Sequence, residues 1–95
     1  MARRLAPNQR LAYEHLRVLT QDIVVRHATV LQRVLAESIG VHQTTVSNVL
    51  KGRITSIVTL EAIGRALLPM VSGDDQRLLL DELALVMPFV RQPRR

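Results

Sequence analysis

Four polar side chains capable of hydrogen bonding lie close together near the middle of the chain. They carry amides and hydroxyls but no charge, and they are Gln43, Thr44, Ser47 and Asn48. A glutamine or asparagine amide can donate and accept at once, which matches the edge that adenine shows in the major groove of DNA, and a threonine methyl can touch that of thymine. The set could therefore read base edges, provided that all four side chains share one exposed face.

A short third helix over about residues 42–51 would provide that face. Helical spacing turns Val46, Val49 and Leu50 to one side and leaves the four polar side chains, together with Lys51, on the other. An ordinary solvated helix would usually carry more glutamate and lysine on its outer face. We therefore expect a polar, almost uncharged strip that points outward.

The segment before this helix has the residues needed for a tight reversal. Two helices cross closely only where the contact residue is small, and a three-residue connection needs one residue that accepts a positive φ. Ala36 and Gly40 meet these two requirements. Apolar residues also fall at the offsets that point into a core shared by two such helices, namely Leu35, Ile39, Val41, Val46 and Val49. The spacing predicts a helix-turn-helix.

In this stretch the chain resembles the lambda-repressor-like helix-turn-helix family, also called Cro/cI or XRE. The resemblance covers residues 32–53, including the trailing Lys-Gly-Arg turn, and continues over 59–67, which looks like the fourth helix of that family. The chain departs from the family at Leu31 and His42, where serine or threonine often caps a helix. We therefore expect the second helix to begin earlier, at Thr29.

The resemblance implies that the first, second and sixth residues of the third helix, here Gln43, Thr44 and Asn48, read bases. It also implies that Gln32 and the turn from Lys51 to Arg53 hold phosphates. The side-chain chemistry agrees with this division. The expected base-reading set is Gln43, Thr44, Ser47 and Asn48. The expected phosphate-contacting set is Gln32, Arg33, His42, Thr45, Lys51 and Arg53, where His42 either caps the third helix or touches a phosphate.

Helical periodicity also predicts the elements before the third helix. One continuous helix is expected over residues 8–26, because Ala12, Leu16, Leu19 and Ile23 recur at four-three-four spacing, with a heptad of Leu11, Val18 and Val25 beside them. Thr29 can cap the second helix and Gly40 can end it. Its expected inward residues are Val30, Leu31, Val34, Leu35 and Ile39.

Two further helices are expected after the Lys51-Gly52-Arg53 turn. Thr55 or Ser56 caps the fourth, which Pro69 closes, with Leu60, Ile63 and Leu67 inward. Ser72 and Asp75 form a capping-box pattern that opens the fifth. The chain is thus expected to be a single all-α domain of five helices over residues 1–95, with a core over 7–69, a C-terminal helix over 72–90, and basic tails at 1–6 and 91–95.

The fifth helix carries more apolar residues than one face can bury. Ten of the thirteen residues from 78 to 90 are apolar, and a core needs only Leu79, Leu83 and Val86. The surplus residues, which we expect to form a homodimer contact, are Leu78, Leu80, Leu85, Met87 and Phe89. Alternatively, the long first helix covers both sides within one chain. A two-fold dimer would place its third helices about 34 Å apart and would bind a palindrome.

Charge and composition narrow the class of partner. The net charge is +5, and twelve of the thirteen cations are arginine, which suits phosphate. Residues 1–53 carry eight cations and three anions, whereas 54–90 carry two and five, so the N-terminal half is the expected face for a polyanion. With no cysteine and no long apolar run, the chain is expected in the cytoplasm, associated with the nucleoid of a bacterial or phage-infected cell.

We expect a sequence-specific DNA-binding transcriptional regulator without a cofactor. No enzyme is expected, because His15, His27 and His42 lack metal-ligand or catalytic spacing and the glycines lie too far apart for a nucleotide loop. Two alternatives remain open. One is an antitoxin that binds a toxin and regulates its own synthesis through the same motif. The other is an architectural binder that is indifferent to sequence.

Overall fold

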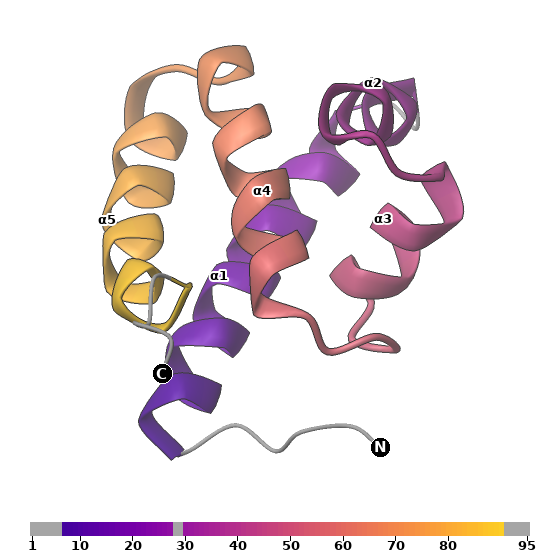
Figure 1. Cartoon of the computed structure of the whole chain (residues 1–95). Coiled ribbons are helices and arrows are strands. Elements are labelled where there is room, and N and C mark those ends of the chain that lie inside the picture. The colour runs from indigo at the N-terminus through magenta and orange to yellow at the C-terminus, as the bar shows by residue number, and fades with distance from the viewer. Residues whose placement is uncertain (1–6, 28–29, 91–95) are drawn as a thin grey trace.

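The helices predicted from periodicity are present in the computed structural model, which describes residues 7–27 and 30–90. They are α1 (Pro7–Arg26), α2 (Val30–Ile39), α3 (Gln43–Leu50), α4 (Ile57–Leu67) and α5 (Gly73–Val90), and a 3-10 turn, η1 (Leu68–Met70), follows α4 (Figure 1). The described ranges contain no strand. An all-α architecture with an uninterrupted first helix is therefore confirmed.

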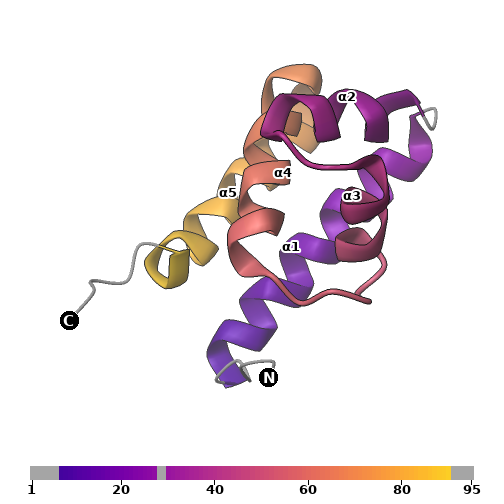
Figure 2. The same cartoon turned by 45° about the vertical axis from the view of Figure 1, so that its right-hand side comes forward.

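Two central helices, α1 and α4, hold the others together. α1 packs against α3, α4 and α5, and α4 contacts α2 and α3 as well as α5. The α2 and α3 helices lie on one side of this centre and α5 lies on the other, as the two views show (Figures 1 and 2). The side chains that carry the candidate site are thus separated from α5 by the core.

The core is mainly aliphatic, with Tyr13 as its one buried aromatic side chain among the described residues, and it is built from the inward faces that the sequence predicts. Leu16 and Ile23 of α1 are buried. The buried residues predicted for α4 and α5 are Leu60, Ile63, Leu67, Leu79, Leu83 and Val86. Burying each of these leucine, isoleucine and valine side chains stabilises the fold by roughly 1.5 to 3 kcal/mol.

The exposure of one α2 side chain and the caps of the helices differ in part from the prediction. Val34 was expected to point inward, but it is 39% exposed, because α2 packs mainly against α3 and α4 and these helices cover only part of its surface. Asp75 does not form the expected capping box with Ser72 and instead pairs with Arg26 of α1. Ser56 caps α4 as expected and accepts a hydrogen bond from the Thr59 amide. The predicted cap at Thr29 lies outside the described residues.

A glycine allows α4 and α5 to approach closely. A Cβ added at Gly64 would lie 2.8 Å from Cδ2 of Leu83 on α5, closer than real Cβ contacts. Glycine in the middle of a helix weakens it by roughly 0.8 to 1 kcal/mol relative to alanine, so its presence here is explained by the contact. Along the described ranges, no helix is both long enough and apolar enough to cross a membrane.

Candidate nucleic-acid interface

The connection between α2 and α3 has the geometry that the sequence predicts. Gly40 takes a φ of +75°, and the Val41 amide donates to the Ala36 carbonyl at 3.0 Å, which is the closing bond of a Schellman motif. Ala36 is buried where the two helices meet. α3 begins three residues after Gly40, and its flanking residue, His42, makes no side-chain capping bond. The capping role considered for His42 is therefore not observed.

The inner and outer faces of α3 divide as predicted. Val46, Val49 and Leu50 have no exposed surface, and the partly buried Ile39 and Val41 pack against the same core. On the opposite face, Gln43 and Thr44 are exposed, while Ser47 and Asn48 are half-buried. We call these four polar side chains the α3 strip. Because its inner face is locked in the core, α3 presents the strip in one fixed orientation.

The α3 strip lines a shallow hollow together with two of the predicted phosphate-contacting residues. The hollow has a volume of about 290 Å³, and its walls are Gln32, Gln43, Thr44, Ser47, Asn48 and Arg53. The structure thus brings together residues from α2, α3 and the turn after α3. The remaining predicted phosphate-contacting residues do not line the hollow: Arg33, His42 and Lys51 are exposed, and Thr45 is half-buried.

Backbone hydrogen bonds fold the turn after α3 back onto the helix. The carbonyl of Asn48 accepts from the amides of Arg53, at 2.8 Å, and Ile54, at 3.2 Å. The Gly52 amide donates to Val49 at 3.1 Å. This short return places Arg53 beside the α3 strip, so a cationic side chain stands at the edge of the uncharged hollow.

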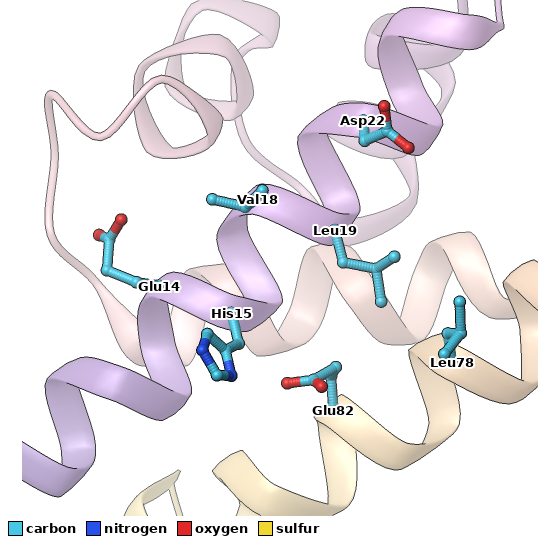
Figure 3. A pocket seen from close by; sticks show the side chains of 7 residues that line it. All are labelled: Glu14, His15, Val18, Leu19, Asp22, Leu78 and Glu82. Carbon is cyan, nitrogen blue, oxygen red and sulfur yellow. The ribbon is translucent and has the colours of Figure 1, made fainter.

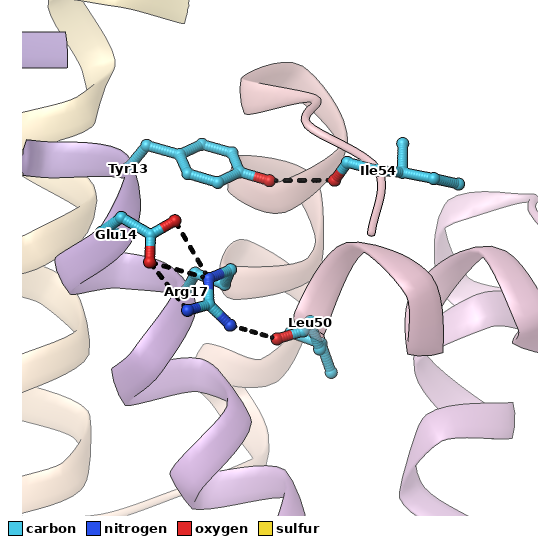
Figure 4. A network of polar contacts seen from close by, with 5 residues as sticks. All are labelled: Tyr13, Glu14, Arg17, Leu50 and Ile54. Carbon is cyan, nitrogen blue, oxygen red and sulfur yellow. Dashed lines mark hydrogen bonds and ion pairs between the residues drawn. The ribbon is translucent and has the colours of Figure 1, made fainter. Parts of the chain in front are cut away.

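Two side chains of α1 donate hydrogen bonds to backbone carbonyls at the end of α3 and in the turn that follows it (Figure 4). Arg17 donates from Nη1 to the Leu50 carbonyl at 2.9 Å and from Nη2 to the Glu14 carboxylate at 2.7 Å. The Tyr13 hydroxyl donates to the Ile54 carbonyl at 3.1 Å. We call Tyr13 and Arg17 the α1 clamp, because they satisfy carbonyls at both ends of the turn between α3 and α4.

The electrostatics of the α1 clamp follow from its contacts. Burial of the ring raises the pKa of Tyr13, against the opposing effect of a nearby backbone hydrogen bond. The hydrogen bond from Arg17 lowers the pKa of Glu14. The same bond raises the pKa of Arg17, so the guanidinium stays charged. The arginine is therefore a permanent donor toward the end of α3.

Sequence reasoning missed the α1 clamp. Its bonds join residues 33 and 41 positions apart, and no periodicity reports contacts between such distant segments. The only available signals were the Glu14 and Arg17 pair, spaced one helical turn apart, and a lone tyrosine on the inward side of the first helix. Neither signal names the partner carbonyl.

The surplus apolar residues of α5 remain partly uncovered. Leu78, Leu80 and Leu85 each expose about half of their surface, while the side chains of Met87 and Phe89 are partly buried. α1 packs against α5, and Arg26 donates to both carboxylate oxygens of Asp75 at 3.0 and 3.1 Å. The first helix nevertheless leaves leucines exposed on α5, contrary to the alternative in which it covers both sides.

Comparison of the chain with protein-family models, with curated proteins and with solved structures finds no match. Within residues 7–27 and 30–90, no group of three or more histidine, cysteine, aspartate or glutamate side chains is arranged to hold a metal ion. The geometry around α3 is therefore the main guide to function.

Proposed function

We propose that the chain is a sequence-specific DNA-binding transcriptional regulator of the lambda-repressor-like helix-turn-helix type. In this proposal α3 enters the major groove, and two copies of the chain bind a palindromic operator. The observation that carries the proposal is the α3 strip, in which four uncharged hydrogen-bonding side chains project from one helix beside Arg53. A helix about 10 to 12 Å across fits a major groove about 12 Å wide.

Base recognition would come from the amides of the strip. Gln43 is exposed at the start of α3, and Asn48 lines the same hollow about 1.4 turns later, so the two amides can meet different bases. Thr44 and Ser47 lie between them and add a methyl and hydroxyls. A strip of lysines would bind any duplex, whereas these groups distinguish one base pair from another.

Affinity would come from the cations around the strip. Arg53 lines the hollow, Lys51 directly follows α3, and Arg33 is exposed on α2, so these cations can replace counterions on phosphates. The α1 clamp holds Arg53 and its turn in place through the Ile54 and Leu50 carbonyls. Binding should therefore weaken steeply with salt, while the preference for one sequence should depend on the strip.

Alanine variants test this division. Gln43→Ala or Asn48→Ala should weaken binding to the preferred duplex by about 1 to 3 kcal/mol and relax its sequence, as expected when a bidentate base contact is lost. Arg53→Ala should weaken binding to all duplexes alike. Arg77→Ala is the matched control, because Arg77 is exposed on α5, across the core from the strip. Equal losses on preferred and random duplexes for all three test variants would contradict the proposed roles.

A further inference from the structure

An apolar surface runs along α1 and α5 on the side of the molecule away from the α3 strip. Leu11 and Val18 on α1 are more than half exposed, and so is Leu85 on α5, while Leu78 is 49% exposed. On each helix the two residues are seven apart, which places them on the same face. Spacing of this kind is typical of helices that pack against further helices. We call these four residues the α1–α5 face.

Two hollows lie between the residues of this face. One, of about 470 Å³, has Val18, Leu19 and Leu78 in its wall, and the other, of about 330 Å³, has Leu11, Leu85 and Phe89. His15 lines both, so the hollows meet along the contact of the two helices. The smaller hollow has mainly apolar walls, whereas the wall of the larger one also contains the carboxylates of Glu14, Asp22 and Glu82.

An acidic side chain in the larger hollow lacks a partner. Glu82 points from α5 toward α1 beside His15 (Figure 3), and its Oε1 atom is buried without a hydrogen-bond partner among the described residues. A buried polar atom without a partner destabilises a fold, so a donor from outside the described part of the chain would be favourable here.

We propose that a second copy of this chain packs on the α1–α5 face, so that α1 and α5 of the two copies form a four-helix bundle. A two-fold contact needs a surface that is complementary to itself. This face can meet that requirement, because each copy offers both protruding side chains, three leucines and Val18, and hollows between them. Two pairs of helices with heptad-spaced apolar residues pack in such bundles at a small crossing angle.

The dimensions of the face suit a stable dimer. α1 has 20 residues and α5 has 18. At about 1.5 Å per residue and roughly 10 Å per helix, the pair spans roughly 30 by 20 Å, or roughly 600 Å² in projection. Because side chains project from the helices, the accessible area is larger than this projection and approaches the roughly 800 Å² per partner that specific interfaces bury. A second copy can therefore cover the face without additional segments.

The α1–α5 face differs from the homodimer contact that the surplus apolar residues of the fifth helix predicted. Leu78, Leu85 and Phe89 line the hollows beside α1. Leu80 is 51% exposed, but it lies about 200° around the helix from Leu78, and Met87 shares its flank. The bundle therefore excludes Leu80 and Met87 and includes Leu11 and Val18 of α1, which composition alone did not select.

A second copy on the α1–α5 face would not cover α3. α5 and α3 lie on opposite sides of α1 and α4 (Figure 1), so pairing through α1 and α5 leaves both α3 strips uncovered. The need for two copies rests on the proposed function, whereas the choice of face rests on exposure and hollows.

Sedimentation equilibrium of the full chain without DNA tests the interface. The wild type should be a dimer, and Leu78→Glu and Val18→Glu should raise the dimer Kd by roughly 30-fold or more, the size of effect reached at interface hot spots. Leu80→Glu is the matched control, because Leu80 has the same helix and the same exposure and should leave the dimer intact. Circular dichroism checks whether each variant is folded.

If a glutamate variant fails to fold, methyl NMR of the wild type during dilution decides instead. Methyl signals of Val18 and Leu78 should shift with concentration, and those of Leu80 should not. A wild type that is monomeric at about 100 μM, where a micromolar dimer is mostly assembled, would overturn the proposal. So would dissociation by Leu80→Glu alone, or capture of a different small protein in place of the second copy. None of these results depends on DNA. Sequence-specific DNA binding could therefore be confirmed even if the interface were wrong, and the interface could be confirmed even if the chain did not select bases.

Discussion

Replacing Arg17 with methionine should loosen the end of α3. Leu50 is the last residue of α3, so its carbonyl has no partner within the helix and accepts from the Arg17 guanidinium instead. Methionine keeps an unbranched apolar stem but has no donor. The substitution therefore removes the hydrogen bond to Leu50 and the ion pair with Glu14 together.

The two lost contacts have different magnitudes. A hydrogen bond from a charged donor contributes about 1.5 to 3 kcal/mol. The Arg17 side chain is 20% exposed, so water replaces part of this bond and the contribution to Leu50 falls to about 1 kcal/mol. Glu14 is 45% exposed, and a pair within one helix at such exposure contributes at most about 0.5 kcal/mol. We therefore expect Arg17→Met to destabilise the fold by about 1.5 kcal/mol.

A double-mutant cycle separates the two contacts. Urea unfolding followed by circular dichroism gives the free energy of unfolding for the wild type, Arg17→Met, Glu14→Gln and the double variant. Glu14→Gln alone should lose at most about 0.5 kcal/mol, and Arg17→Met should still lose about 1 kcal/mol in the Glu14→Gln background. If Arg17→Met loses no more than Glu14→Gln, or if its effect disappears in that background, then the bond to Leu50 does not fasten α3.

Three further predictions concern the backbone and the pH dependence. Gly40→Ala should destabilise the fold by about 1 kcal/mol, measured by thermal unfolding, because φ is +75° while no atom lies within 4 Å of the new Cβ; Gly40→Asn should lose less, and equal stabilities would show that the turn needs no left-handed residue. Gly64→Ala should also lose about 1 kcal/mol, through the clash with Leu83, and a Leu83→Val background should reduce this loss. The pKa of Tyr13 is raised by burial, so the folded chain holds the phenolic proton more tightly than the unfolded chain; the stability it contributes is fully present below the ordinary pKa of 10.0 and is lost as the pH rises through the folded pKa. Urea unfolding across that alkaline range should therefore show a steeper fall for the wild type than for Tyr13→Phe, and parallel curves would contradict the assignment.

The geometry of α3 could be predicted because it depends on neighbouring residues. Val46, Val49 and Leu50 alternate with the strip at helical spacing, and Gly40 marks the turn through its own backbone preference. A short helix with one apolar face has only one orientation on a core. The predicted strip could therefore be placed without knowledge of the other helices.

Other features depend on which segments meet in three dimensions, and sequence spacing does not report this. The Tyr13 hydroxyl bonds a carbonyl 41 residues away, and Arg26 draws Asp75 away from its expected cap across 49 residues. The outward position of Val34 likewise follows from the narrow cover that α3 and α4 give to α2. Periodicity finds the apolar residues of a helix but does not show which of them a neighbour covers.

Selection from a pool of random duplexes with the purified full chain tests most directly whether the α3 strip reads base edges. Sequencing of the bound duplexes should recover a palindrome with half-sites about 10 base pairs apart, centre to centre, and the Asn48→Ala chain should lose preference at one position of each half-site. Recovery of a pool with no preferred sequence, retained equally by the wild type and the variant, would contradict a role of the strip in recognition.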